Sequence, residues 1–252
     1  MLENFREDER DGFGWTMVLD KGLGLNALDD LLVVAASYVQ VIKFGWGTSG
    51  VLDPELVRTK TRRIRERGIH VCPGGTFLEI AYARDLVDEF LVDAQDLGFD
   101  SVEVSNGAVD MRHRAKLDLI GRAQSRGFVV FSEIGKKDPT KDRSMGIEER
   151  AEHAHRELEA GSEKVIMEAR ESGSLGIFDG SGSVRCDFLD SLVSLLDLQK
   201  ILFEAPRKSQ QVWLVKQFGA AVHLGNVAPG DAVALETLRR GLRADTLHDF
   251  LP

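Results

Sequence analysis

The chain is short of cysteine, of long apolar runs and of positive charge, and each shortage excludes a class of protein. Cys72 and Cys186 are its only cysteines, which excludes a disulfide scaffold and a cysteine-based zinc site and fits a reducing cytoplasm. No apolar run reaches the ~18 residues of a membrane-spanning helix. The net charge of −9 argues against a general nucleic-acid binder, although it does not argue against a local basic pocket.

The composition and length fit one soluble globular domain. Hydrophobic residues make up 43% of the 252 residues and charged residues 29%, which is ordinary for such a protein. Residues 1–12 are acidic and lack an apolar segment, so no secretory signal is expected there. We expect a single domain over residues 1–252, in which residues 1–15 form a short N-terminal extension.

Eight short β-rich segments recur along the chain, and stretches of helical character lie between them. Asp53 and Pro54 are typical of a helix start, as the N-cap and the first helical residue. The strands are predicted at 16–20, 39–44, 69–72, 101–104, 128–133, 164–168, 201–204 and 222–225. The helices are predicted at 28–38, 54–67, 78–97, 110–126, 146–160, 188–198, 209–218 and 229–242.

This alternation predicts an α/β protein with a parallel sheet, because a parallel crossover needs a connection as long as a helix. Eight such units in a chain of this length favour a single (β/α)8 TIM barrel, and an open doubly wound sheet is the alternative. No Gly-x-Gly-x-x-Gly motif follows the first strand, which removes the usual mark of a dinucleotide site.

Acidic residues stand at or near the ends of four consecutive predicted strands. The active site of such a barrel lies at the C-terminal ends of its strands. An isolated buried charge is very costly, so these carboxylates must be paired, hydrated or bound to a metal. Carboxylates and water suit Mg²⁺, and the alternative is a structural ring of salt bridges. The candidate metal ligands are Glu103, Glu133, Glu168 and Glu204.

Basic residues follow the same strand ends, and they suit an anionic substrate. The loops after strands seven and eight are a frequent phosphate site in this fold, and a helix N-terminus there favours anions. That corner holds Arg207, Lys208, Ser209, Gly225 and Asn226. The cations at the other strand ends are Lys21, Lys43, Lys136, Lys137 and Arg170.

Two connections are unusually long for a compact domain. Residues 137–146 follow the fifth predicted strand, and the Gly- and Ser-rich residues 171–187 follow the sixth. Long loops of this kind are often lids or disordered segments. A lid would exclude water from a reactive intermediate.

The strand-end motifs resemble the phosphosulfolactate synthase family, the ComA-like proteins. The resemblance extends from about residue 16 to residue 242, and a long, specific run lies at 203–219. The motifs are TMVLDKGL (16–23), KFGWGT (43–48), CPGGTFLE (72–79), VEVSNG (102–107), EIGKK (133–137), EARESG (168–173), FEAPRKSQQVWLVKQFG (203–219) and LGNV (224–227).

The resemblance implies a (β/α)8 barrel and a carbon–sulfur lyase that uses Mg²⁺ to add sulfite to phosphoenolpyruvate. The product would be (2R)-phospho-3-sulfolactate, on a route to coenzyme M in archaea. It also implies a homo-oligomer, with a trimer as one candidate, and partners that are small anionic substrates rather than nucleic acid or membrane.

The chemistry implied by the resemblance needs a general acid that protonates C2 of the substrate. A lysine whose pKa is lowered by neighbouring cations suits this role, and the motif EIGKK offers Lys136 and Lys137, of which we favour Lys137. Two alternatives remain. In the first, the chain is a related lyase that adds another nucleophile to phosphoenolpyruvate. In the second, it is a non-catalytic, stress-related barrel protein.

Overall fold

The eight predicted β-rich segments form the strands of a parallel barrel in the computed structural model, which describes residues 12–249. Their residues are almost all buried, because helices cover one side and the barrel interior the other. Residues 1–11 of the predicted N-terminal extension lie outside the described residues. The strands are β1 (Thr16–Asp20), β2 (Val41–Phe44), β3 (His70–Pro73), β4 (Ser101–Val104), β5 (Val129–Ile134), β6 (Lys164–Met167), β7 (Ile201–Glu204) and β8 (His223–Val227).

The sheet runs in the order β3-β2-β1-β8-β7-β6-β5-β4, with parallel pairing between neighbours. Within residues 12–249 no ladder joins β3 to β4, but the two strands pack against each other. A side chain bridges this seam, because the backbone N–H of Val71 donates to Asp100 Oδ1 at 2.8 Å. The predicted single (β/α)8 barrel is confirmed, and the open doubly wound sheet is excluded.

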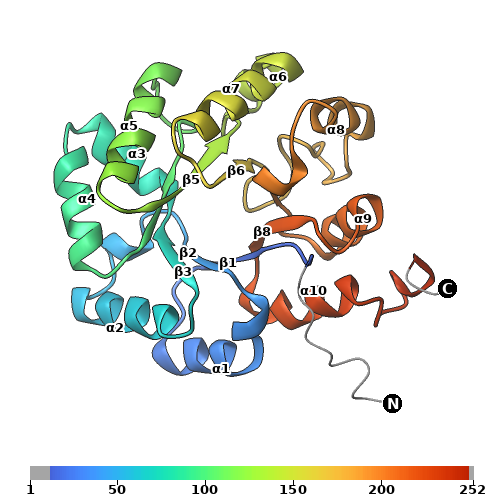
Figure 1. Ribbon diagram of the computed structural model, residues 1–252, viewed down its shortest axis with the longest axis horizontal. Helices are drawn as coiled ribbons and strands as arrows, with labels where there is room; N and C mark the ends of the chain where they lie inside the picture. Colours follow the sequence, from blue (N-terminus) through green and yellow to red (C-terminus); the bar gives the residue numbers. More distant parts are fainter. Residues whose placement is uncertain (1–11, 250–252) are drawn as a thin grey trace.

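Helices surround the strands on the outside of the barrel (Figure 1). The predicted N-cap is confirmed, since the side chain of Asp53 accepts hydrogen bonds from the N–H groups of Glu55 and Leu56. The helices are α1 (Leu25–Ala35), α2 (Pro54–Arg65), α3 (Gly75–Ala83), α4 (Val87–Asp96), α5 (His113–Ser125), α6 (Pro139–Ser144), α7 (Ile147–Glu159), α8 (Cys186–Val193), α9 (Lys208–Phe218) and α10 (Ala232–Arg239). Short 3₁₀ turns lie at Ala36–Tyr38, Thr48–Gly50, Leu198–Lys200, Pro229–Asp231 and Leu247–Asp249.

Two predicted segments differ from the observed ones. The single helix expected at 78–97 is two helices, α3 and α4, because Asp85 between them adopts a left-handed backbone with φ of 58°. Aspartate tolerates that conformation better than most residues, so the break carries no glycine or proline signal. The expected loop at 137–146 contains α6, which Asp138 caps through the N–H groups of Thr140 and Lys141.

The inward side of the strands changes from apolar to charged along the barrel axis. An inner cluster is formed by Met17, Val41, Cys72, Phe131, Ile166 and Leu202. Side chains alternate between the two faces of a strand, so the next inward position lies two residues further on. On β2, β5 and β7 that position holds Lys43, Glu133 and Glu204, and directly after β6 it holds Glu168. The barrel is therefore packed at one end and polar at the other.

The two cysteines do not pair with each other in the folded protein. Cys72 is fully buried in the inner cluster, Cys186 is exposed, and both are free thiols. Within residues 12–249, no helix combines the length and the apolar character needed to cross a membrane.

Candidate active site

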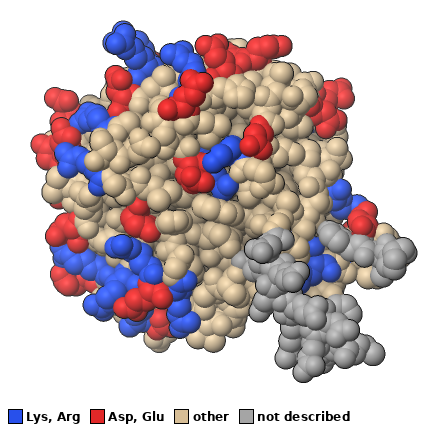
Figure 2. All heavy atoms as spheres, viewed as in Figure 1, with Lys and Arg blue, Asp and Glu red and all other residues tan. Residues whose placement is uncertain are grey.

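A cavity of about 690 Å³ opens at the C-terminal ends of the strands. Figure 2 shows a small group of acidic and basic side chains near the centre of one face, separated from the charged residues at the rim. The cavity is lined by Leu19, Lys43, Trp46, Gly74, Gly75, Thr76, Glu103, Glu133, Lys137, Glu168, Arg170, Glu171, Ser172, Glu204 and Asn226.

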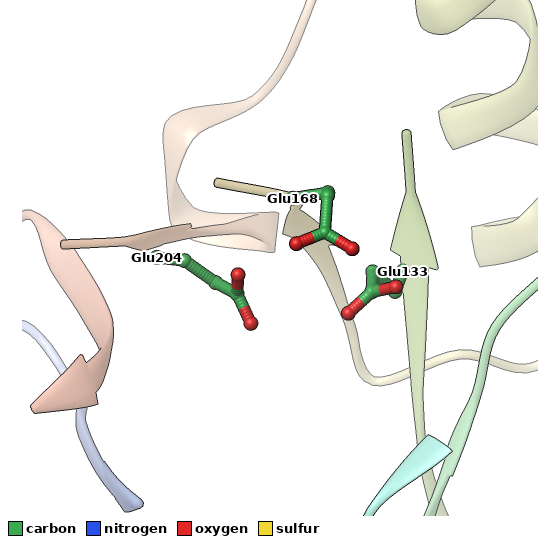
Figure 3. A group of neighbouring side chains, drawn as sticks. All are labelled: Glu133, Glu168 and Glu204. Carbon is green, nitrogen blue, oxygen red and sulfur yellow. The ribbon is translucent and has the colours of Figure 1, made fainter. Parts of the chain in front are cut away.

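Three carboxylates from neighbouring strands converge in this cavity (Figure 3). Each of Glu133, Glu168 and Glu204 offers an oxygen within 4.8 Å of the other two, and all three residues are buried. Glu133 Oε1 and Glu168 Oε2 have no hydrogen-bond partner. Burial, followed by the charges of Glu133 and Glu204, raises the pKa of Glu168 well above its ordinary value. The cluster therefore has the ligand type, the spacing and the uncompensated charge that a divalent cation requires.

Lys43 separates the fourth predicted metal ligand from this cluster. Its Nζ lies 2.8 Å from Glu103 Oε2 and 3.1 Å from Glu204 Oε1. Burial alone would lower the pKa of Lys43, but the surrounding carboxylates outweigh it and hold the pKa well above its ordinary value. Glu103 Oε1 also accepts the N–H of Gly75 at 3.0 Å. Glu103 thus has two partners, unlike the unpaired oxygens of Glu133 and Glu168.

The two candidate acids point to different places. Lys137 lines the cavity, and its Nζ donates to Thr76 Oγ1 at 2.8 Å. Lys136 does not line the cavity, and its Nζ donates to the backbone carbonyl of Asn106 at 2.7 Å. Burial and the nearby Lys116 lower the pKa of Lys136.

The lowered pKa expected of the acid does not apply to Lys137. Burial would lower the pKa of Lys137, but the carboxylates of Glu133 and Glu168, with those of Glu79 and Glu103, raise it above its ordinary value. The expectation assumed that cations crowd this lysine, whereas acidic residues surround it. Lys137 is therefore held as an ammonium ion.

The cavity mouth carries charged residues from loops on two sides. Lys21, after β1, forms an ion pair with Glu171, after β6, and both side chains are about half exposed. Arg170 adopts a left-handed backbone with φ of 61°, and its N–H donates to Glu168 Oε1 at 2.5 Å. The loop after β6 is thus joined to the carboxylate cluster near its start.

The predicted phosphate corner after β7 and β8 contributes only one side chain to the cavity. Arg207 Nε and Nη1 donate to the carbonyls of Ser172 and Ser181, at 2.7 and 2.6 Å. Lys208 Nζ lies 2.8 Å from Asp245 Oδ2. Of the described residues at this corner, Arg207, Lys208, Ser209 and Gly225 are outside the cavity lining. Their predicted role as substrate ligands stays a prediction.

Asn226 is the member of that corner that reaches the cavity. It adopts a left-handed backbone with φ of 53°, and its Oδ1 is buried without a hydrogen-bond partner. Gly225 is needed beside it, because a Cβ at that position would overlap the side chain of Leu202.

The loop over residues 171–187, expected as a lid or a disordered segment, is held by hydrogen bonds. Besides its bonds from Arg207, it accepts bonds from Gln210 Nε2 to the carbonyls of Gly173 and Gly182, at 2.6 and 3.2 Å. Gln210 is itself buried. These bonds hold the loop segment that supplies Arg170, Glu171 and Ser172 to the cavity wall.

The sequence assigned no role to two residues of α3. Thr76 binds the candidate acid, and Glu79 is a fully buried carboxylate near the cavity. Both lie in the motif CPGGTFLE (72–79), to which the sequence attached no role beyond the resemblance. The clue available was the position of Glu79 in the first turns of a helix that begins at the C-terminal end of a strand.

Comparison with solved structures supports the barrel assignment. A 3-hexulose-6-phosphate synthase superposes with a TM-score of 0.55 at 14% identity, covering 91% of this chain and 100% of that chain. A phosphonopyruvate hydrolase in complex with oxalate and Mg²⁺ has a TM-score of 0.55 at 13% identity, covering 95% of this chain and 84% of that chain. At such identities the likeness shows the fold alone.

Comparison with protein sequences identifies the family. The phosphosulfolactate synthase of Methanocaldococcus jannaschii is 45% identical over 234 residues, covering 92% of this chain and 93% of the relative. That of Bacillus subtilis is 38% identical over 234 residues, covering 92% of each. The family described as (2R)-phospho-3-sulfolactate synthase (ComA) matches residues 4–245. With this match over nearly its whole length, the chain belongs to the phosphosulfolactate synthase family.

Proposed function

We propose that the protein adds sulfite to phosphoenolpyruvate in a Mg²⁺-dependent reaction, as a carbon–sulfur lyase that forms (2R)-phospho-3-sulfolactate. The observation that carries this proposal is the meeting of three buried carboxylates and Lys137 in one cavity. The relatives, which are phosphosulfolactate synthases, support the choice of product. The site chemistry supports the choice of an anionic substrate and a divalent cation.

Glu133, Glu168 and Glu204 would hold the cation. The unpaired, buried oxygens of Glu133 and Glu168 are costly unless positive charge compensates them, and carboxylates are ligands that Mg²⁺ prefers. When bound, Mg²⁺ supplies charge that stabilises an enolate-like dianion as it develops on the substrate. Lys43 lies beside this proposed cation site and forms ion pairs with both Glu103 and Glu204.

Lys137 delivers the proton. Sulfite sulfur forms a bond to C3 of the enol phosphate, the electron pair of the double bond moves to C2, and C2 then takes a proton from the Nζ ammonium of Lys137. The raised pKa of Lys137 ensures that this proton is present before the reaction begins. Delivery from one fixed side of the cavity would set the R configuration. Lys136 is less suited, because its Nζ is directed to a backbone carbonyl outside the cavity lining.

Arg170 and Lys21 would attract and hold the anionic groups of the substrate, with Asn226 as a polar partner deeper in the cavity. Arg170 and Asn226 line the cavity directly. Lys21 lies at the mouth, where its partner Glu171 belongs to the cavity lining. An incoming dianion would compete with Glu171 for Lys21, and such an exposed ion pair is weak enough to exchange.

The proposal is tested by incubating the purified protein with phosphoenolpyruvate, sulfite and Mg²⁺. We expect a product that carries both phosphate and sulfonate in the mass spectrum, and we expect a chelator to abolish it and added Mg²⁺ to restore it. Lys137→Ala should lower kcat by about 10²–10⁴-fold, the usual contribution of a general acid, while Lys136→Ala should retain most activity.

A folded protein that gives no such product, or a Lys137→Ala variant as active as the wild type, would contradict the proposal. A panel of thiols and oxyanions in the same assay separates sulfite addition from the addition of another nucleophile to phosphoenolpyruvate. The Lys136→Ala variant is the matched control, because the two lysines are adjacent in sequence and differ in where Nζ points.

A further inference from the structure

The N-terminal part of α3 contacts Lys137 from two directions. Thr76 Oγ1 accepts the Nζ of Lys137 at 2.8 Å, at the reactive end of the side chain. One turn further along the helix, Glu79 binds the loop between β4 and α5, and that loop binds the backbone of Lys137. Both ends of the lysine are therefore tied to a single helix.

Glu79 is a fully buried carboxylate whose partners all belong to the loop after β4. Its Oε1 accepts the hydroxyl of Ser105 and the N–H of Gly107, the latter at 3.0 Å. Its Oε2 accepts the N–H groups of Ala108 and Val109, at 2.7 and 2.9 Å. Hydrogen bonds to a charged acceptor are about twice as strong as neutral ones. With four donors from one loop, the carboxylate of Glu79 fixes that loop against α3.

The same loop lies directly against the candidate acid. The carbonyl of Gly107 accepts the N–H of Lys137 at 3.0 Å. A Cβ on Gly107 would stand 3.3 Å from Lys137 Cγ, so the loop backbone lies close against the lysine side chain. A shift of the loop would therefore move the lysine.

We propose that Glu79 and Thr76 are positioning residues for Lys137. Glu79 sets the loop that holds the lysine backbone and stem, and Thr76 fixes the direction of Nζ. This inference rests on the proposed role of Lys137 as the proton donor. It extends that role, because it assigns the geometry of proton delivery to a helix whose residues carry none of the strand-end charges.

Kinetics of three variants test the inference. Glu79→Gln removes the charge at nearly constant size, Glu79→Asp keeps the charge but withdraws it from the loop, and Thr76→Val removes the acceptor of Nζ at constant shape. We expect each to lower kcat by about 10–100-fold, as small misplacements of a catalytic group do, with KM for phosphoenolpyruvate changed less than about threefold. In a Lys137→Ala background the same substitutions should have no further effect on kcat.

Glu236→Gln is the matched control. Glu236 is also a buried carboxylate and contacts Arg240, but it lies on α10 outside the cavity lining. This variant should keep the kcat of the wild type. A loss of kcat equal to that of Glu79→Gln would reduce the role of Glu79 to general stability and overturn the inference. A wild-type kcat in Glu79→Asp would show that charge alone matters and would also overturn it.

A second measurement needs no substrate and no activity. Competitive acylation of lysines, read by peptide mass spectrometry with the exposed Lys141 as reference, reports how firmly Nζ of Lys137 is held. Thr76→Val should raise the relative reactivity of Lys137 about tenfold, the equivalent of one hydrogen bond to a charged group. Unchanged reactivity in Thr76→Val and Glu79→Asp would overturn the inference. Wild-type protein that fails to turn over, yet shows these changes, would count against the proposed function alone.

Discussion

Buried charged residues lie on both sides of β5, but those on the outer side form an ion pair and those on the inner side are carboxylates facing one another. On the outer side, Lys116 and Glu157 form an ion pair at 2.7 Å, and Lys116 Nζ also donates to the backbone carbonyl of Glu133 at 2.6 Å. On the inner side, the carboxylate of the same Glu133 faces Glu168 and Glu204, and its Oε1 has no partner. Glu133 thus contacts a lysine–glutamate ion pair through its backbone and other carboxylates through its side chain.

The difference lies in the partners and not in the burial. Glu157 and Glu168 are both buried, and burial by itself raises the pKa of each. Lys116 and His113 outweigh burial at Glu157 and lower its pKa, whereas Glu133 and Glu204 add to burial at Glu168 and raise its pKa. Removing one partner of the outer pair would leave a buried charge uncompensated, whereas the carboxylates of the inner cluster repel one another, a repulsion that a bound cation would relieve.

The largest expected effect comes from removing one carboxylate on each side. Glu157→Gln leaves the ammonium of Lys116 buried without its counter-ion, so the free energy of unfolding should fall by about 3–5 kcal/mol. Glu168→Gln removes a repelling charge, so in the presence of a chelator the free energy of unfolding should stay level or rise. Urea unfolding measures both. Destabilisation by Glu168→Gln as large as that by Glu157→Gln would erase the contrast.

The second effect is the dependence of stability on pH. The pKa of Glu168 in the folded state is raised above its unfolded value of 4.5, so its contribution to stability is present below that value. The contribution is lost as the pH rises through the folded pKa. The pKa of Glu157 is lowered, so its contribution is present above 4.5 and is lost as the pH falls through the folded pKa.

This contrast is measured by urea unfolding of the wild type and Glu168→Gln with a chelator, between about pH 5 and pH 8. The wild type should lose stability relative to the variant as the pH rises, and Mg²⁺ should reverse that loss, because a bound cation favours the ionised carboxylates. Parallel pH profiles of the two proteins would contradict the raised pKa.

The smallest expected effect tests whether Arg207, at the start of α9, holds the loop at 171–187 or binds the substrate. Arg207→Ala removes the hydrogen bonds to Ser172 and Ser181, so protease cleavage within 171–187 should accelerate and the free energy of unfolding should fall by about 1 kcal/mol. Lys208→Ala is the control, since exposed ion pairs contribute about 0–1 kcal/mol. An increase in KM for phosphoenolpyruvate with an unchanged cleavage rate would instead make Arg207 a substrate ligand.

The barrel could be predicted from the sequence because its signals are local. The apolar strands, the cap at Asp53 and the charged residues two positions after the inner cluster all follow from short-range periodicity. The break at Asp85 and the helix α6 could not be predicted in this way. The break depends on the left-handed backbone of Asp85, which carries no sequence signal. The helix α6 was missed because it is only 6 residues long, although Asp138 and Pro139 repeat the start signal of Asp53 and Pro54.

The site was predictable only as a set of candidates. Sequence position brings Glu103, Glu133, Glu168 and Glu204 to the same end of the barrel, but it does not say which of them pair. Lys43 meets Glu204 across 161 residues of sequence, and Arg207 turns to a loop instead of the cavity. Likewise, adjacent Lys136 and Lys137 look equivalent in the motif, yet their Nζ atoms have different partners.

The amino-acid sequence by itself determined that eight strands alternate with helices and that charged side chains gather where the strands end. The tertiary structure decided which of those charges neutralise one another and which remain available to a ligand. The physical reason is range. Strand and helix periodicity is encoded between near neighbours, whereas the ionisation of a buried group depends on charges a few ångströms away that come from distant parts of the chain.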